Sequence, residues 1–566
     1  MPAKIRRIAF ILATAIALSS APSAQALQAP DIRTVDLVPG DGSSAARGFT
    51  RLGGWDYFVT GGVDRQYATG IWRTNGTTTE LVADNLNVAL ESNLYEMKPP
   101  RAFAALGTYL YFSADDGASG SEIWRTDGSS VARVADLCAT PTCDGAVGVP
   151  FTSGSWVYFN GFTSATGAEL WRTNGTTTSI VKDTVAGAEG ANFADFYTHQ
   201  GILYFRYTND ANGAELGQTN GTSSGTVLYN LTPGSDDSNP HGFTTFADRL
   251  FFSAESQLWS LTPTQAPALF YRPNSSGNSF VNTLTVVGSQ MFFNAENNAD
   301  GRELWVTTGD PTDPSATTQV ANISTGAGSS NPMWLTAFGS RVYFAASDGS
   351  GGVELWSSNG RDASLVADIN PGSESSSPND LTVFAGALYL YANDGELWRV
   401  TDSTSANRQS MVRLWDDPLE PYDTAINVAL EAVGDKLYFH TGVVGAGREY
   451  AWMQAPAAPR SVVAPTITGS AKVGRVLTSA RGSWSGVPSA ITSAQWYRCT
   501  SAGPSAGTTT PTTSSLSGCV TISGATKATY KAVAADKGKY LRLRVKAQNE
   551  SGTVYRWSKA TVKIAP

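Results

Sequence analysis

The stretch from Val353 to Gly360, which reads Val-Glu-Leu-Trp-Ser-Ser-Asn-Gly, decides the fold because versions of it recur along most of the chain. Close copies run from Ala168 to Gly175 and from Ser121 to Gly128. In each copy Glu and Trp stand two residues apart, so both side chains lie on one face of a strand. The closing Asn-Gly or Asp-Gly pair accepts the positive φ angles of a tight hairpin turn. Each copy therefore predicts a strand that runs into a hairpin.

The repeat has the period of a propeller blade. Its aromatic position recurs every 42 to 54 residues, as Trp at 72, 124, 171, 259, 305, 356, 398 and 452 and as Gly at 217. Each unit reads as four short strands and three turns, without a helical period. Because one such meander buries too little surface to be stable alone, neighbouring units must pack around a ring. The sequence predicts an all-β fold with a β-propeller of nine four-stranded blades. Eight blades are the alternative, because Pro263 and Pro267 fall where the unit near Trp259 needs its last turn and strand.

The two ends of the repeat region complement each other. The last unit stops at its third strand, residues 449–452, and has no fourth strand of its own. Residues 33–40 resemble residues 363–372, which form the fourth strand and turn of a complete unit. If the first strand completes the last blade, the ends are held by hydrogen bonds and no sheet edge is free. We expect residues 33–38 to pair with the blade of Trp452.

These repeats resemble the ELWxxDGT-repeat (hyalin-like) family of secreted bacterial proteins over residues 31–455. The chain departs from the family motif at Gly70, Gln257 and Gly217, and the unit at Trp452 has its Glu one place early. The resemblance implies a propeller. It supplies no reaction and no catalytic residue, so it informs the fold more than the function.

Four segments are predicted along the chain. Residues 1–26 read as a signal peptide, with a basic start, an apolar run too short to span a bilayer, and the small-residue cleavage site Ala24-Gln25-Ala26. Residues 27–455 hold the propeller, and residues 456–464 read as a semi-extended Pro/Ala linker. Residues 465–566 read as an Ig-like β-sandwich. The predicted location is secreted and extracellular, with loose attachment to the cell surface as an alternative.

The last segment resembles the bacterial Ig-like modules of secreted and wall proteins. Residues 536–540 match the Asp-x-Gly-x-Tyr corner of such folds, and Trp496 stands where they bury a tryptophan. Arg542 stands where their second core cysteine is expected. The resemblance implies a two-sheet sandwich.

The four cysteines suit an oxidising compartment. Cys138 and Cys143 bracket four residues, while Cys499 and Cys519 flank a stretch rich in Gly, Ser, Thr and Pro. We predict the disulfides Cys138–Cys143 and Cys499–Cys519. A metal site is the alternative, but it would need four converging ligands in a chain with three histidines.

Charge divides along the boundary between the two domains. Residues 460–566 hold 15 Lys and Arg against two acidic residues, a net charge of +13, whereas the propeller segment carries −24. Such an asymmetry concerns partners rather than fold. One interpretation is that these charges only keep both parts in solution. The sharper interpretation is that a basic strand face contacts anionic wall polymers through Arg542, Arg544 and Lys546, with Lys537 and Lys539 near its start.

No catalytic, cofactor-binding or metal-binding residue is predicted. A glutamate that recurs in six units, as Glu122, Glu169, Glu215, Glu303, Glu354 and Glu396, is better explained by structure, because buried carboxyl groups must find hydrogen-bond partners. Acid-rich turns such as residues 115–117 and 348–349 offer the oxygen ligands that Ca²⁺ requires. Asx-Gly clusters are also ordinary turn chemistry. We predict no cofactor and keep calcium as an open alternative.

The sequence favours an exported, non-enzymatic binding or adhesion-type protein, with the propeller as the ligand platform and the basic domain as a wall contact. Its expected partners are an unidentified glycan or protein ligand and an anionic cell-wall polymer, with no nucleic acid, no membrane span and a monomeric chain. One alternative is a carbohydrate-active enzyme with two channel carboxylates about 5 to 9 Å apart. Against it, expected innermost strands such as residues 284–287 and 381–384 carry few charges. A purely structural spacer is the other alternative.

Overall fold

The structure is a computed structural model, which describes residues 11–12, 32–37, 44–61, 67–91, 99–138, 140–393, 395–400, 411–415, 430–443, 447–455, 457–487, 491–502, 514–549 and 552–566. They divide into two compact units, formed mainly by residues 34–452 and by residues 453–566. Nearly all regular structure in this part of the chain is β-strand. Its only helices are two three-residue 3-10 helices, Pro314–Ala316 and Ala534–Asp536.

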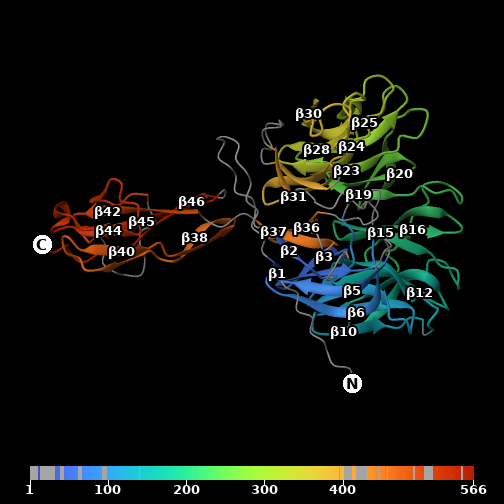
Figure 1. The fold of residues 1–566 in the computed structure, drawn as a ribbon. Helices are drawn as coiled ribbons and strands as arrows, with labels where there is room; N and C mark the ends of the chain where they lie inside the picture. Colours follow the sequence, from blue (N-terminus) through green and yellow to red (C-terminus); the bar gives the residue numbers. More distant parts are fainter. Residues whose placement is uncertain are drawn as a thin grey trace. The chain divides into compact units, whose positions relative to one another are not determined.

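Nine antiparallel blades follow one another in chain order around the first unit, from blue to orange in Figure 1. The first two are joined into one eight-stranded sheet, because the end of β6 also pairs with β8. Blades 1 to 4 consist of β3 (Arg47–Leu52), β4 (Trp55–Thr60), β5 (Tyr67–Thr74) and β6 (Thr79–Ala89); β7 (Ala104–Leu106), β8 (Tyr109–Asp115), β9 (Ser121–Thr126) and β10 (Val131–Ala135); β11 (Ala146–Ser153), β12 (Trp156–Thr163), β13 (Gly167–Thr173) and β14 (Thr178–Lys182); and β15 (Asn192–His199), β16 (Ile202–Asn209), β17 (Gly213–Thr219) and β18 (Val227–Leu228). Blades 5 to 8 consist of β19 (His241–Phe246), β20 (Arg249–Ala254), β21 (Gln257–Thr262) and β22 (Gln265–Tyr271); β23 (Asn282–Val287), β24 (Gln290–Asn297), β25 (Gly301–Thr307) and β26 (Thr317–Ala321); β27 (Met333–Phe338), β28 (Arg341–Ser347), β29 (Val353–Ser358) and β30 (Ala363–Ala367); and β31 (Asn379–Phe384), β32 (Ala387–Ala392), β33 (Glu396–Val400) and β34 (Met411–Trp415).

The unit near Trp259 keeps all four strands, so the alternative of eight blades is wrong. Pro263 lies in the turn between β21 and β22, where no ladder hydrogen bond is lost. Pro267 lies in β22, the outermost strand, at a break in the register between Ser260 and Thr262 of β21. An outer strand with a local irregularity tolerates the missing proline N–H. The two prolines therefore leave the blade intact.

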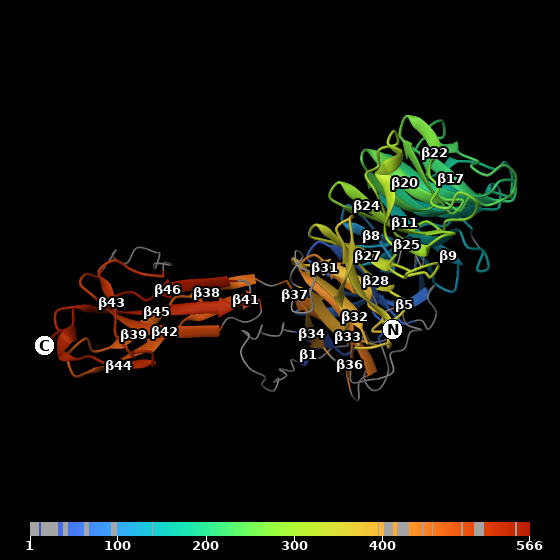
Figure 2. The same cartoon turned by 90° about the horizontal axis from the view of Figure 1, so that it is seen from above.

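Blade 9 joins the two ends of the propeller. Its sheet contains β35 (Glu431–Val433), β36 (Lys436–Val443) and β37 (Gly447–Gln454), followed by β2 (Arg33–Val35). Just beyond β2, the N–H of Leu37 donates to Glu449 Oε2 at 3.1 Å. The predicted closure is confirmed for residues 33–35, and Figures 1 and 2 show the first and last blades side by side. A two-residue strand, β1 (Ile11–Leu12), adds to β2, while the rest of the predicted signal peptide lies outside the described residues.

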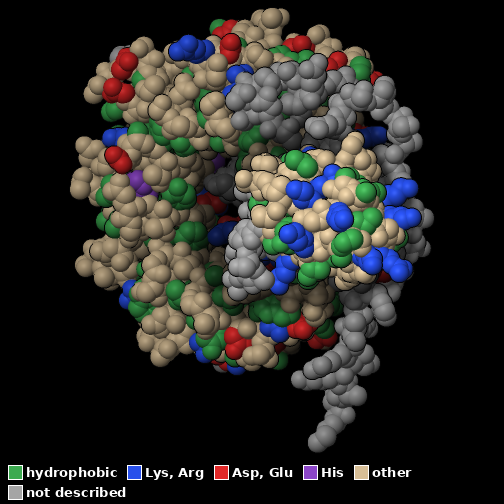
Figure 3. Space-filling view, turned by 90° about the vertical axis from the view of Figure 1, so that its left-hand side faces the viewer, with side chains coloured by type: hydrophobic (Ala, Val, Ile, Leu, Met, Phe, Trp, Pro, Cys, Tyr) green, Lys and Arg blue, Asp and Glu red, His purple; other side chains and the backbone are tan. Residues whose placement is uncertain are grey.

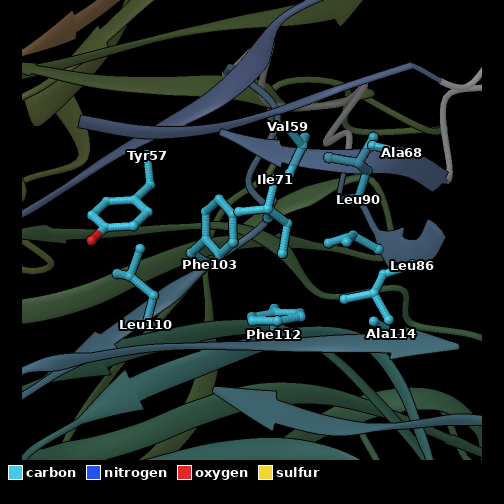
Figure 4. Packing of buried hydrophobic residues seen from close by; sticks show 12 residues of the cluster. Tyr57, Val59, Ala68, Ile71, Leu86, Leu90, Phe103, Leu110, Phe112 and Ala114 are labelled. Atoms are coloured by element: carbon cyan, nitrogen blue, oxygen red, sulfur yellow. The ribbon is translucent and has the colours of Figure 1, made fainter. Parts of the chain in front are cut away.

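Aromatic and aliphatic side chains of neighbouring blades fill the spaces between the sheets. Figure 4 shows the core between blades 1 and 2, where Phe103 and Ile71 lie side by side above Phe112. The Phe103 and Phe112 rings meet edge to face with centroids 5.8 Å apart. Fully burying a side chain of this size contributes about 1.5–3 kcal/mol. Because every blade supplies half of two such cores, the ring is stable only as a whole.

Packing explains why Gly217 stands where other blades have the repeated tryptophan. It lies opposite Phe205 in the pairing of β16 with β17, and a Cβ atom on Gly217 would come within 2.1 Å of the Phe205 ring. In blade 7 the equivalent pair is Phe344 and Trp356. The Phe205 ring thus covers the third strand where other blades place an indole.

The second unit contains the predicted sandwich. Its sheets consist of β39 (Thr466–Gly469), β40 (Val476–Ala480) and β44 (Thr529–Lys531), of β42 (Ile491–Cys499), β43 (Cys519–Thr521), β45 (Tyr540–Asn549) and β46 (Gly552–Trp557), and of the pair β38 (Ala457–Val463) and β41 (Ser483–Val487). Trp496 is fully buried in its core, as the resemblance implied. Residues 457–463 correct the prediction of an extended linker, because β38 pairs with β41 in this unit.

Both predicted disulfides are confirmed. Cys138 pairs with Cys143 in the loop after β10, and Cys499 pairs with Cys519. The second bond joins neighbouring strands β42 and β43 of one sheet. It therefore closes a loop and does not join the two sheets of the sandwich.

Deletion of residues 27–40 should lower the midpoint of thermal unfolding by several degrees, because it removes the fourth strand of blade 9. The freed edge of β37 should also cause concentration-dependent association, detectable by light scattering. Deletion of residues 27–31 alone is the control, since it leaves β2 in place. A longer deletion that stays monomeric with an unchanged midpoint would contradict the closure.

Candidate functional site

The recurring glutamates are structural, and they do not form a shared site. The carboxylate of Glu354, on β29, accepts hydrogen bonds from the Ile369 N–H at 2.8 Å and from the N–H and hydroxyl of Ser376 at 2.8 and 2.6 Å. Ile369 follows the fourth strand of the same blade, and Ser376 precedes the first strand of the next blade. Glu354 therefore ties its own outer strand to the connection that starts the next blade. We call this arrangement the glutamate latch.

The same latch recurs in other blades. Glu303 accepts from Ile323, Ser324 and Ser330, and Glu215 accepts from Leu231, Thr232 and Ser238. Glu169 accepts from Thr184 and Val185, and Glu122 accepts from Leu137 and Cys138. Together with the bonds of Glu354, these hydrogen bonds confirm that five of the six recurring glutamates have a structural role. Glu396 differs, because it accepts from Asn393 and from the indole N–H of Trp398.

Two variants of the latch show what it requires. In blade 5 a neutral amide replaces the carboxylate, and Gln257 bonds Ser279 and the Gly277 carbonyl. In blade 9 Glu449 holds Leu37, a residue 412 positions earlier in the chain. Glu449 stands one place early in its repeat, yet it accepts a backbone N–H hydrogen bond as the other latch glutamates do. Its donor, Leu37, lies just beyond the strand that closes the ring.

The acid-rich turns use their oxygens internally. Asp116 Oδ1 accepts from the N–H groups of Ala118 and Ser119, and Asp348 Oδ1 accepts from those of Ser350 and Gly351. These hydrogen bonds lower the pKa of both aspartates. Within the described ranges, no group of three or more His, Cys, Asp or Glu is placed to hold a metal ion. The turns therefore have the geometry of ordinary Asx turns.

The first strand of most blades, which faces the channel, contains a bulge. In seven blades the pairing of the first with the second strand is interrupted by a bulge or similar irregularity. One residue in each interruption has a positive φ: Gly48, Gly148, Asp195, Gly242, Thr283, Trp334 and Asp380. Glycine accepts this conformation freely, whereas for a β-branched or bulky residue it is an outlier. Thr283 and Trp334 each hold a strained backbone at a cost of about 1–3 kcal/mol.

Threonines next to these bulges link neighbouring blades. The hydroxyl of Thr336 lies 3.0 Å from the carbonyl oxygen of Trp334 and 3.0 Å from that of Leu381 in the next blade. The hydroxyls of Thr285 and Thr382 make the same pair of contacts in blades 6 and 8. In blade 9 Glu431 occupies this position, and its two carboxylate oxygens accept from the N–H groups of Gly48 and Phe49 of blade 1. The bulges at Trp334, Asp380 and Gly48 are thus held both from their own strand and from the preceding blade.

A cavity of about 200 Å³ opens at this level of the channel. Its walls come from β19, β23, β27 and β31, with one residue from the connection between β6 and β7. The lining residues are Pro99, Gly242, Thr244, Thr283, Leu284, Thr285, Trp334, Leu335, Thr336 and Leu381. Three of the positive-φ residues therefore line it directly. Its lining combines threonines and backbone with three leucines, a proline and one indole.

Two carboxyl groups lie on the inner strands of blades 8 and 9, outside the residues that line the cavity. Asp380 occupies in β31 the bulge position that Gly242, Thr283 and Trp334 occupy in their strands. Burial raises the pKa of Asp380 to about 7. Burial also raises the pKa of Glu431 to about 8, with a smaller effect from the charge of Asp380. The expectation that innermost strands carry few charges missed Asp380, because its range began at Leu381, two residues after the start of β31. Glu431 lies in β35, outside the strands on which that expectation was based.

The basic C-terminal unit has a different charged surface from the predicted one. Arg542 is buried, and its guanidinium donates to the carbonyls of Ser558 and Ala502. Arg544 lies over the rings of Tyr497 and Tyr555, 5.1 Å from each centroid. The predicted strand face is therefore corrected, because two of its three cations are engaged within the unit.

Exposed bases gather instead at one end of this unit. Backbone hydrogen bonds join three segments there, between Ala532 and Arg475, between Ile564 and Lys539, and between Val473 and Ala565. We call the bases on these segments the basic end: Lys472, Arg475, Lys531, Lys537, Lys539 and Lys563. Figure 3 looks onto this side of the unit and shows Lys and Arg side chains spread across it. The acidic residue that the structure describes in this unit, Asp536, is buried and bonded to Arg498.

Comparison with known proteins adds no family. No protein-family model and none of the curated proteins matches the chain. Among solved structures, a chain from a structural and mechanistic study of two prolyl endopeptidases is similar to this one, with 12% identity and a TM-score of 0.33. The match covers 64% of this chain and 55% of that chain, so it spans about half the length of that chain. BamB from Moraxella catarrhalis is similar with 13% identity and a TM-score of 0.33, over 65% of this chain and 97% of that chain. At these values the likenesses do not bear on function.

No helix in the described residues has the length and apolar character needed to cross a bilayer.

The latch carboxyls should make the fold less stable as pH rises. Burial raises the pKa of Glu122, Glu169, Glu303 and Glu354, and that of Glu449 to about 7. A raised folded-state pKa contributes stability that is complete below about pH 4.3, the ordinary value for Glu, and is lost as pH rises through the folded-state value. The free energy of unfolding, measured with denaturant, should therefore fall between pH 5 and pH 8.

Glu449→Gln should reduce that fall by on the order of 2 kcal/mol, because an amide does not titrate. Blade 5 shows with Gln257 that a neutral amide fits the latch. The control is Glu374→Gln, at an exposed loop position. A pH profile identical in Glu449→Gln and in the unaltered protein would contradict the assignment.

Proposed function

We propose that this chain is an exported, non-enzymatic binding protein. The propeller receives a ligand in its channel, and the basic end of the C-terminal unit contacts an anionic cell-wall polymer. The observation that carries the proposal is the cavity around Trp334. Its indole is held in the channel by a backbone conformation that costs energy, and such strain persists where the surrounding structure enforces it, often at binding sites. The signal-peptide pattern of residues 1–26 and the two disulfides support export.

A carbohydrate-active enzyme is the alternative that a specific observation favours. Asp380 and Glu431 are two carboxyl groups close enough for one charge to raise the pKa of the other. Hydrolysis of glycosides needs a general acid and a carboxylate that acts as nucleophile or base, placed on either side of the glycosidic bond. Glu431 is held by two backbone N–H groups of the next blade, so its position serves the ring. We therefore assign Glu431 to the junction of blades 9 and 1.

The binding function predicts retention of the full chain on immobilised glycans or peptides without their cleavage. Trp334→Phe should weaken retention about tenfold, because a smaller ring covers less apolar surface. Trp356→Phe in the same blade is the matched control, since Trp356 lies on β29 away from the inner strand. Released sugar that disappears in Asp380→Asn would establish the enzyme. A chain that binds no probe would support the structural spacer.

The basic end predicts salt-dependent binding of the full chain to wall polymers. Attraction between exposed charges is screened within roughly 10 Å at 0.1 M salt, so sedimentation with teichoic acid should weaken as salt rises. Replacement of Lys531, Lys537 and Lys563 by Glu should abolish it at low salt, because all three are exposed on the basic end.

Two exposed bases elsewhere on the same unit provide the control. Arg481→Glu with Lys559→Glu changes the net charge in the same direction and leaves the basic end intact. Equal losses in both variants would show that net charge acts without a defined surface. Binding that is unaffected by either variant would assign wall contact to the propeller or to neither unit.

A further inference from the structure

Two inner-strand bulges of the ring, one in blade 1 and one in blade 7, are built alike. Each begins with a residue of positive φ, 70° at Gly48 and 57° at Trp334. Each leaves that residue and the next one outside the pairing with the second strand. In each, a threonine two residues further on contacts the carbonyl oxygen of the first residue through its hydroxyl. The two bulges therefore direct their backbone N–H groups to the same side of the strand.

In blade 1 the bulge binds a carboxylate that the chain itself supplies. The N–H groups of Gly48 and Phe49 donate to the two oxygens of Glu431, at 2.9 and 2.6 Å. Glu431 lies on β35, the inner strand of the preceding blade. Two successive backbone N–H groups that converge on one group form an anion-binding concavity. This bulge is thus a carboxylate site that is filled from within the ring.

Blade 7 has the same pair of donors but no such carboxylate. The residue of blade 6 equivalent to Glu431 is Thr285, because both stand opposite the first aromatic residue of the second strand. The shorter Thr285 side chain contacts the carbonyl oxygen of Leu335, 3.1 Å from its hydroxyl. Among the described residues, no side chain accepts a hydrogen bond from the N–H of Trp334 or Leu335.

The two bulges also differ in their exposure. Both donors of blade 1 and their carboxylate are buried. Trp334 and Leu335 are half-buried, and they line the channel cavity together with Thr285. Leu284 and Leu381 add apolar surface beside the indole, and none of the lining residues is ionisable. The donors of blade 7 therefore face a space that can receive a ligand.

We propose that the bulge of blade 7 binds a carboxylate on an apolar stem through the N–H groups of Trp334 and Leu335. The carboxylate of the ligand takes the place that Glu431 takes in blade 1, and its stem lies along the leucines and the indole. Such N–H bonds to a carboxylate are charge-assisted, and they are about twice as strong as bonds between neutral groups. A peptide C-terminus with an apolar last residue shares this chemistry with a free aliphatic acid. This inference rests on the proposed binding function and specifies its ligand.

The test follows the amide resonances of Trp334 and Leu335 in the full chain while four probes are added: N-acetyl-leucine, N-acetyl-leucinamide, hexanoate and N-acetylglucosamine. The first two differ only in whether they end in a carboxylate or an amide. We expect N-acetyl-leucine to bind about tenfold more tightly than its amide, because only the acid accepts charge-assisted hydrogen bonds. Hexanoate at the affinity of N-acetyl-leucine would support the site with a free acid as its ligand, and much weaker binding would support it with a peptide terminus.

Thr285→Glu should abolish binding of the acid, because blade 6 then carries the carboxylate that blade 9 carries as Glu431, and the chain fills its own site. Thr382→Glu is the matched control, since it adds the same charge at the equivalent position of blade 8, outside the cavity lining. It should keep the preference for the acid. Thermal unfolding of both variants checks that the fold is retained.

Salt distinguishes this site from the basic end of the C-terminal unit. The net negative charge of the propeller segment repels an anion, so added salt should not weaken binding in the channel. Binding that weakens with salt, or a preference for the acid that survives Thr285→Glu, overturns the proposal. Equal binding of N-acetyl-leucine and its amide, or binding of N-acetylglucosamine alone, also overturns it and leaves a binding protein. If no probe binds in the channel, the proposed function fails as well.

Discussion

A buried carboxyl group on the third strand of the blade is the interaction on which the rest of the propeller depends. Each glutamate latch satisfies backbone N–H groups that follow the fourth strand, and in blades 6 and 7 it also accepts from a backbone N–H that precedes the next blade. In blade 4 the hydroxyl of Ser238 takes that place. Buried polar groups without such partners would cost about 1–3 kcal/mol each. The latch thus allows a short loop to leave the outside of one sheet and enter the inside of the next. It also explains how a strand from the start of the chain completes blade 9, because Glu449 holds Leu37 as Glu354 holds Ile369.

The channel is shaped by a second repeated device, the bulge of the inner strand. A bulge redirects one side chain out of the regular alternation. Where that residue is glycine, as at Gly48, Gly148 and Gly242, the chain accepts positive φ without penalty. Where it is Thr283 or Trp334, the same backbone carries a side chain that lines the cavity. The blades are therefore alike in architecture, and the differences that matter for binding are concentrated at one position of each inner strand.

Much of the fold could be predicted because it depends on local, repeated patterns. The Glu-x-Trp spacing and the Asn-Gly turns identify the third strand, and the resemblance of residues 33–40 to residues 363–372 predicts the closure. The linker prediction failed because Pro and Ala composition says nothing about pairing, and β38 pairs with a strand 20 residues and more away. Arg542 was misplaced because alternation identifies a strand face but not the loop that covers it. The channel carboxyls were missed because a bulge shifts the alternation by one residue. The recurring pattern of a variable residue two places before Thr, as in Trp334-x-Thr336 and Asp380-x-Thr382, was the signal that could have found Asp380.

The central claim is that one hydrogen bond, donated by the Leu37 N–H to the Glu449 carboxylate, fastens the beginning of the chain into its last blade. Residue-resolved hydrogen exchange of the Leu37 amide tests it most directly. If Glu449 accepts this N–H in a closed ring, Leu37 exchanges as slowly as Ile369, whose amide is held by Glu354 in the middle of the chain. If Leu37 exchanges at the rate of an exposed, unbonded amide while Ile369 stays protected, the ring is open at blade 9 and the account is contradicted.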